Sequence, residues 1–315
     1  MLRILLLAVL LMLSALAFSP SQAHAAVCTV QAADLDFGAV DAIGNTPATT
    51  TAGIDISCDG ITSGTATITV CGNLGAGSAG EASGVRQAVS GGNALGFALY
   101  ASSGTSQPWG STANPELGNP LEIDLPVSGT TVSKTVELYG IVPSGQSSAP
   151  VGDYQTSFGS SDAVFTYAEG ALDCAAPGGG TDAYAAFAVN ASIAANCLLE
   201  TNDLDFGTAG IIGEDIDADT SIAITCTPGT GYGITIDGGG SGDPDHRQMH
   251  SGTDTVDYDL YSDAARHNPW GTSLASTVTG SGSGDAQQMA VYGRIPPQQV
   301  APGHYTDTVV VTITY

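Results

Sequence analysis

Apolar and polar residues alternate in short runs along most of this chain. Residues 65–70 read Thr-Ala-Thr-Ile-Thr-Val, and residues 307–315 repeat the same two-residue period. Clusters of Gly, Pro, Asn and Ser separate these runs, and no long stretch with a helical period follows residue 25. Alternation of this kind, broken by turn residues every ~8–12 positions, predicts an all-β fold of the sandwich type.

Two long stretches of the sequence are versions of each other. Residues 28–38 read CTVQAADLDFG, and residues 197–207 read CLLETNDLDFG. Further pairs follow in the same order: Cys58 and Cys226, Arg86 and Arg247, Tyr100 and Tyr261, Trp109 and Trp270, Tyr139 and Tyr292, Tyr154 and Tyr305. Internal repetition is strong evidence about architecture, so one β-sandwich domain is expected twice in tandem.

The first copy is longer than the second. The offset between equivalent residues falls from 169 at the first cysteine to 151 at the last tyrosine, and the extra residues concentrate at 72–85 and 111–126. Function often resides in loops on a rigid scaffold. Leu74, Leu117 and Leu121 are therefore predicted as exposed apolar loop tips and candidate surface-binding residues. Simple drift in loop length is the alternative.

Residues 1–25 have the features of a secretory signal peptide. Arg3 is followed by an apolar run too short to span a bilayer, and Ala23-His-Ala25 resembles a cleavage site. The protein is therefore expected to be exported, with no membrane insertion of the mature chain.

The composition excludes some partners. The chain has 31 acidic and 6 Lys or Arg residues, a net charge of −25. Nucleic acids and anionic membrane surfaces need cationic partners, so neither is expected to bind.

Six cysteines in an exported chain predict disulfides. The repeat pairs Cys28 with Cys58 and Cys197 with Cys226. Cys71 and Cys174 occur only in the first copy, and by elimination they are expected to pair with each other.

Candidate catalytic groups are sparse, and we expect no enzymatic activity, cofactor or metal. The densest polar cluster is residues 243–250, Asp-Pro-Asp-His-Arg-Gln-Met-His, whose spacing matches no common metal motif. Trp109 and Trp270 could form sugar-binding platforms, but their recurrence favours a structural role. Tyr154 and Tyr305 resemble the tyrosine corners of β-sandwiches.

The ordered series of an early Cys, L-D-F-G, I-x-C, L-Y, P-W-G, Y-G and P-G-x-Y resembles the spore coat protein U domain family, which includes pilins of archaic, Csu-type chaperone–usher pili. The resemblance implies immunoglobulin-like sandwiches that lack their final strand. It also implies that a periplasmic chaperone, and then the N-terminal strand of a neighbouring subunit, completes each fold by β-strand addition.

A segment ahead of the second copy alternates as a donor strand should, with inward positions expected at Ala185, Phe187, Val189, Ala191 and Ile193. We interpret it as completing the first domain in cis, and the alternative is that it begins the second domain. The expected organisation is a signal peptide at 1–25, an adhesin domain at 26–176, a linker and donor strand at 177–196, and a pilin domain at 197–315. The second domain is expected to lack its final strand, with an acceptor strand carrying Val309, Val311, Ile313 and Tyr315.

Cleavage after residue 25 would leave only Ala26 and Val27 before Cys28. Such a subunit could accept a strand but not donate one, which suits a pilus tip. The expected function is surface attachment and biofilm formation at the tip of a cell-surface pilus, after export through the periplasm. The expected partners are a chaperone, an outer-membrane usher, a neighbouring pilin and the attachment surface. The alternatives are a spore or cell coat protein, and a carbohydrate-binding module or hydrolase.

Overall fold

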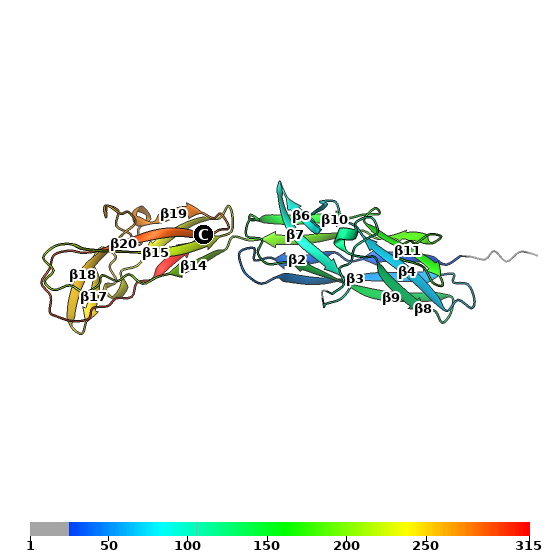
Figure 1. Ribbon diagram of the computed structural model, residues 1–315, viewed down its shortest axis with the longest axis horizontal. Helices are drawn as coiled ribbons and strands as arrows, with labels where there is room; N and C mark the ends of the chain where they lie inside the picture. The colour runs from blue at the N-terminus through cyan, green and yellow to red at the C-terminus, as the bar shows by residue number, and fades with distance from the viewer. Residues whose placement is uncertain (1–24, 105) are drawn as a thin grey trace, which may run out of the picture.

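The computed structural model describes residues 25–104 and 106–315 as two β-sandwich domains placed end to end (Figure 1). The predicted all-β class and tandem arrangement are confirmed. Residues 1–24 of the expected signal peptide lie outside the described residues. Within the part of the chain that is described, no helix is long and apolar enough to cross a membrane.

The first domain packs a large sheet against a smaller one. The large sheet has the order β1-β3-β9-β7-β6-β10-β13-β2, with β5 paired to β6, and the small sheet has the order β12-β11-β4-β8. The strands are β1 (Val27–Ala32), β2 (Leu35–Ala39), β3 (Ala48–Asp59), β4 (Thr67–Leu74), β5 (Glu81–Ala82), β6 (Val85–Ser90), β7 (Asn93–Tyr100), β8 (Leu121–Pro126), β9 (Thr131–Val142), β10 (Gly152–Phe158), β11 (Ala163–Glu169), β12 (Thr181–Tyr184) and β13 (Phe187–Ile193).

The second domain repeats this plan with fewer strands. One sheet has the order β14-β15-β20-β18-β17 and the other β19-β16-β21. Its strands are β14 (Cys197–Thr201), β15 (Ile216–Cys226), β16 (Gly231–Ile236), β17 (Arg247–Ser251), β18 (Asp254–Tyr261), β19 (Val278–Ser281), β20 (Gln287–Ile295) and β21 (Val311–Thr314). Short 3-10 helices cover Pro115–Leu117, Gly239–Ser241 and Leu274–Ser276.

Each domain has its own hydrophobic core, because the alternating residues of both sheets point inward. In β10, Tyr154, Thr156 and Phe158 are buried while the residues between them face solvent. The first core draws on buried side chains from Ala26 to Ile193. The second core is built from buried side chains of β15, β16, β18 and β20 and from Trp270.

The connection between the domains is short. Only residues 194–196 separate β13 from β14. The Asn196 carbonyl accepts a hydrogen bond from the Thr227 backbone at 2.9 Å, and the Asn196 amide donates to Asp41 at 3.3 Å. The last strand of the first domain therefore leads almost directly into the first strand of the second.

Candidate functional site

The position of β13 is the feature of the first domain that bears most directly on function. This strand lies between β10 and β2, antiparallel to the first and parallel to the second. Its register with β10 runs without interruption from Gly152 opposite Ile193 to Phe158 opposite Phe187. The segment from 187 to 193 is thus an interior strand of the first sandwich, although it follows the rest of that domain and immediately precedes the second.

The inward residues of this segment fill the first core. All five positions expected to point inward are at most 6 % exposed: Ala185, Phe187, Val189, Ala191 and Ile193. Phe187 stacks on Phe158 with ring centroids 4.5 Å apart and planes within 4°. Burying large apolar side chains of this kind contributes roughly 1.5–3 kcal/mol each. The segment is therefore part of the folding core of the first domain.

The first aspartate of the repeated D-L-D-F-G motif fixes the backbone of β13. The Asp34 carboxylate accepts a hydrogen bond from the Ala188 amide at 2.7 Å. The adjacent Leu35 is fully buried opposite Val189, and Phe37 is also buried. The sequence identified this motif as part of the repeat but gave no reason for its first aspartate, whose partner lies 154 positions away.

The second domain has segments that correspond to β2 and β10, but among the described residues no strand corresponds to β13. Residues 202–209, which correspond to β2, form no strand, and the counterpart of β10 does not pair along its length. A groove of 1060 Å³ lies between them, and its apolar lining includes Leu199, Leu204, Phe206, Ile222, Met249, Leu260, Val291, Val309 and Val311. Unpaired backbone groups and partly exposed apolar side chains border this groove, as expected of a site for an added strand.

Equivalent residues differ in burial because of this groove. Leu35 and Phe37 are buried under β13, whereas Leu204 and Phe206 are only partly buried. The two positions carry the same side chains in both domains, so the difference arises from the covering strand and not from the local sequence.

Two polar groups lie in the floor of the open groove. The Tyr258 hydroxyl donates a hydrogen bond to one Asp307 oxygen at 2.7 Å, and the Gly240 amide donates to the other at 2.8 Å. Burial, and then the hydrogen bond to Asp307, raise the pKa of the Tyr258 hydroxyl above its usual value of 10. The hydroxyl therefore stays protonated and acts as a donor.

The expected acceptor residues of the second domain lie in two environments. Val309 and Val311 line the groove, where both are partly buried. Ile313 pairs with Ile234 in the neighbouring sheet, and Tyr315 is 55 % exposed. The groove edge is thus the segment from His304 to Val311, upstream of most of β21.

The predicted apolar loop tips of the first domain are wrong. Leu74 ends β4 and is fully buried, Leu117 is 5 % exposed, and Leu121 is partly buried against the core. The extra segment folds back on the domain through Gly118, where a Cβ would collide with the Pro108 carbonyl. The glycines and prolines around these leucines indicated loops, but Leu74 and Leu121 lie at strand ends and Leu117 in a 3-10 helix, and none is an exposed loop tip.

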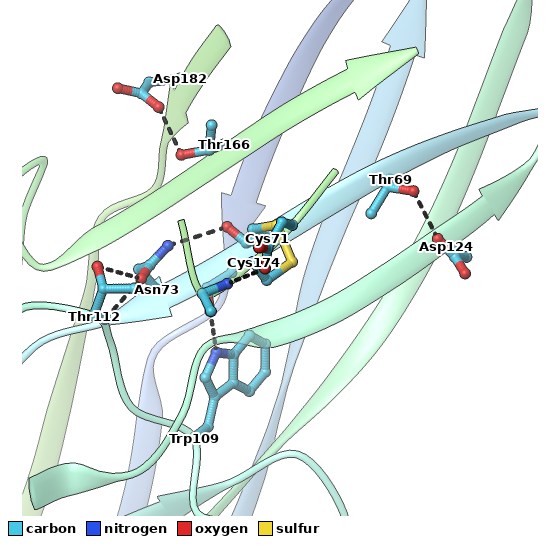
Figure 2. Close-up of a disulfide and its surroundings, with 12 residues drawn as sticks. Thr69, Cys71, Asn73, Trp109, Thr112, Asp124, Thr166, Cys174 and Asp182 are labelled. Carbon is cyan, nitrogen blue, oxygen red and sulfur yellow. Dashed lines mark hydrogen bonds between the residues drawn. A yellow bond between two sulfur atoms is a disulfide. The ribbon is translucent and has the colours of Figure 1, made fainter. Parts of the chain in front are cut away.

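The repeated tryptophans are structural, as their recurrence suggested. Trp109 is 1 % exposed and its indole donates to the Gly72 carbonyl at 2.8 Å, beside the disulfide (Figure 2). Trp270 makes the equivalent bond to Ile234 at 3.0 Å. Tyr154 and Tyr305 are also confirmed as tyrosine corners, because each hydroxyl donates to the carbonyl four residues upstream at 2.7 Å.

No role for the repeated arginines was predicted from the sequence, and each is only 1 % exposed. Arg86 donates to the carbonyls of Leu74, Gly75 and Trp109, each at 2.7 Å. Arg247 makes the equivalent contacts in the second domain. Burial lowers the pKa of Arg86 to about 10 and also lowers the pKa of Arg247. Each arginine joins a strand end to the loop that carries the tryptophan.

All six cysteines form the three expected disulfides. Cys28–Cys58 joins β1 to β3, and Cys197–Cys226 joins β14 to β15 at the equivalent register. Cys71–Cys174 attaches the segment upstream of β12 and β13 to the centre of β4 (Figure 2). This third bridge fixes the start of the chain segment that supplies β13.

In the polar cluster at 243–250, the His246 Nδ1 atom lies 3.0 Å from an Asp243 carboxylate oxygen, and both side chains are largely exposed. Across the residues that the structure covers, no three His, Cys, Asp or Glu side chains are grouped to hold a metal.

Comparisons with known proteins agree with this architecture. The family model described as Spore Coat Protein U domain matches residues 14–159 and 183–312. Protein U of Myxococcus xanthus is 32 % identical over 127 residues, which cover 36 % of this chain and 71 % of the relative.

Two solved structures match this chain at low sequence identity, and the first shows a similar fold. One is a chain of the CsuC–CsuE chaperone–tip adhesion subunit pre-assembly complex from archaic chaperone–usher Csu pili of Acinetobacter baumannii, with a TM-score of 0.52 and 16 % identity over 92 % of this chain and 100 % of that one. The other is the CupB6 tip adhesin of Pseudomonas aeruginosa, with a TM-score of 0.39 and 13 % identity over 92 % and 94 % of the two chains.

Proposed function

Because the chain belongs to the Spore Coat Protein U domain family, we propose that it is the tip subunit of an archaic chaperone–usher pilus, where it mediates surface attachment and biofilm formation. The observation that carries this proposal is the contrast between the two grooves. The first domain is closed by β13 of its own chain, and the equivalent groove of the second domain is open.

The arrangement leaves one acceptor site and no free donor strand among the described residues. β13 is committed to the first domain, and β1 is paired along its length with β3 and tied to it by Cys28–Cys58. A subunit that only accepts a strand ends a fibre. The acceptor groove then binds a strand of a periplasmic chaperone during export, and a strand of the neighbouring pilin after assembly at the usher.

A chaperone partner is supported by the first solved structure, which is a pre-assembly complex of a chaperone with a tip adhesion subunit. The first domain, whose groove is already filled, is the part of this chain that projects beyond the fibre and meets the surface.

The position in the fibre can be tested by labelling. Gold-labelled antibodies against the first domain should mark one end of each isolated pilus, and deletion of the protein should abolish attachment. Label along the whole fibre, or an even layer on a spore or cell surface without pili, would instead support the coat-protein alternative.

The role of the groove can be tested with one substitution and its control. Leu204→Lys places a charge on the groove lining and should prevent incorporation into pili. Leu198→Lys changes an exposed leucine of the same domain and should leave incorporation unchanged. Equal incorporation of both variants would contradict assembly through this groove.

A further inference from the structure

The filled groove of the first domain and the open groove of the second are lined by the same residues at one end but by different residues in the middle. The inference drawn from this difference rests on the proposed function of the open groove. The residues opposite Ile193 and Ala191 are Gly152 and Tyr154, and the second domain keeps Gly303 and Tyr305 at these places. Opposite Val189 and Phe187, the first domain has Thr156 and Phe158, and the second has Asp307 and Val309.

The Thr156 and Asp307 side chains occupy equivalent places. The Thr156 hydroxyl accepts a hydrogen bond from the Ala79 amide at 3.1 Å, and Asp307 accepts one from the Gly240 amide at 2.8 Å. Both amides belong to the loop that follows the equivalent strands β4 and β16. The neighbouring aromatic residue is also more polar in the second domain, because Phe97 of the first domain corresponds to Tyr258 of the second. Both rings make edge contacts with the phenylalanine of the D-L-D-F-G motif.

A strand added to the second groove would therefore place one inward side chain directly beside a carboxylate. In the first domain this inward side chain is Val189, which lies opposite Thr156. Covering Asp307 with an apolar side chain would remove water from a charged group without offering it a new partner, which is costly. A side chain that donates a hydrogen bond would compensate, as opposed polar pairs do across strands.

The charge of the whole groove favours the same kind of strand. Its lining includes Asp203, Asp205 and Asp307, and no Lys or Arg is among the residues that line it in the described chain. Next to Asp307, the change from Phe158 to Val309 leaves more room opposite the position that Phe187 occupies in the first domain.

We propose that the second groove selects a donor strand with a hydrogen-bond-donating side chain opposite Asp307, and that it discriminates against the chain's own 185–193 sequence. The selected strand carries a large apolar residue opposite Val309, a small residue opposite Tyr305 and a branched aliphatic residue opposite Gly303. The Asp203 carboxylate accepts a hydrogen bond from a backbone amide of the added strand, as the Asp34 carboxylate does from the Ala188 amide in the first domain. Asp307 and Tyr258 thus prevent one tip subunit from capturing the donor segment of another.

The test uses labelled peptides and the full mature chain, residues 26–315. One peptide copies residues 185–193, and the second is identical except for Val189→Thr. The threonine peptide should bind wild-type protein about tenfold more tightly, which corresponds to the hydrogen bond gained beside the carboxylate. The double variant Asp307→Thr/Tyr258→Phe, which restores the residues of the first domain, should bind the unchanged copy better than wild type does and reduce the difference between the peptides.

Asp203→Ala serves as the matched control, because it should weaken both peptides equally through the lost backbone contact. Equal affinity of the two peptides for wild type and for the double variant, with binding still sensitive to Asp203→Ala, would overturn the selectivity and leave the open groove intact. Failure of both peptides to bind either protein would overturn the acceptor groove itself, and the selectivity with it. A far-ultraviolet circular dichroism spectrum unchanged from wild type confirms that each variant is folded.

Discussion

At the scale of single residues, the two buried arginines organise the region beside each groove. Among the described residues, Arg86 and Arg247 have no carboxylate as a hydrogen-bond partner, and each donates to backbone carbonyls from separate segments. A guanidinium group suits this role because its planar fork points several donors in fixed directions. The arginine binds the loop carrying the buried tryptophan to the end of the preceding strand, and the same arrangement recurs in both domains.

Replacing Arg86 by leucine should destabilise the first domain by about 3 kcal/mol or more, because three buried carbonyls lose their donor. Arg247→Leu should lower the stability of the second domain instead. Gln87→Leu changes the adjacent residue, which is half-buried, and should have little effect. Thermal unfolding of the full chain, with the threonine peptide added to complete the second domain and each transition followed separately, measures these shifts. Equal effects of Arg86→Leu and Gln87→Leu would show that the carbonyl contacts contribute little.

At the scale of elements, the alternating segment at 185–193 was predictable, but the loops were not. Successive side chains of a strand point to opposite faces, whichever strands it pairs with. The alternating pattern is therefore sufficient to identify the inward residues. The prediction that Leu74 and Leu117 are exposed was wrong because nearby glycines and prolines indicate a turn but do not indicate whether the neighbouring side chains are buried. The role of Asp34 could not be predicted, since its partner is a backbone amide on a distant strand.

The contribution of β13 to the first core can be tested directly. Val189→Asp places an unpaired charge in the first core and should destabilise that domain by more than about 3 kcal/mol. Asn190→Asp introduces the same residue on the outward face of β13, where water solvates it, and should change stability by less than about 1 kcal/mol. Urea unfolding of residues 26–196 provides both values. Similar stability of the two variants would mean that β13 is not required to complete the first core.

At the scale of the whole molecule, the two domains represent a completed and an uncompleted form of one fold. The repeat made the tandem arrangement predictable, and the family model matches both copies. The shared frame extends from the disulfide, which joins β1 to β3 in the first domain and β14 to β15 in the second, to the tyrosine corner. What distinguishes the domains is whether a strand lies between the D-L-D-F-G segment and the segment that contains the tyrosine. That difference depends on long-range pairing, which the local sequence of either segment does not encode.

The separated domains should therefore behave differently. Residues 26–196 include β13 and should unfold cooperatively as a monomer, whereas residues 26–184 lack it and should be much less stable. Residues 197–315 should aggregate or lack a cooperative transition until a strand is supplied, because the groove leaves apolar residues such as Leu204 and Phe206 partly exposed. Differential scanning calorimetry with and without the threonine peptide tests this expectation. A cooperative, monomeric transition of 197–315 alone would show that the second domain is stable with an open groove and needs no added strand.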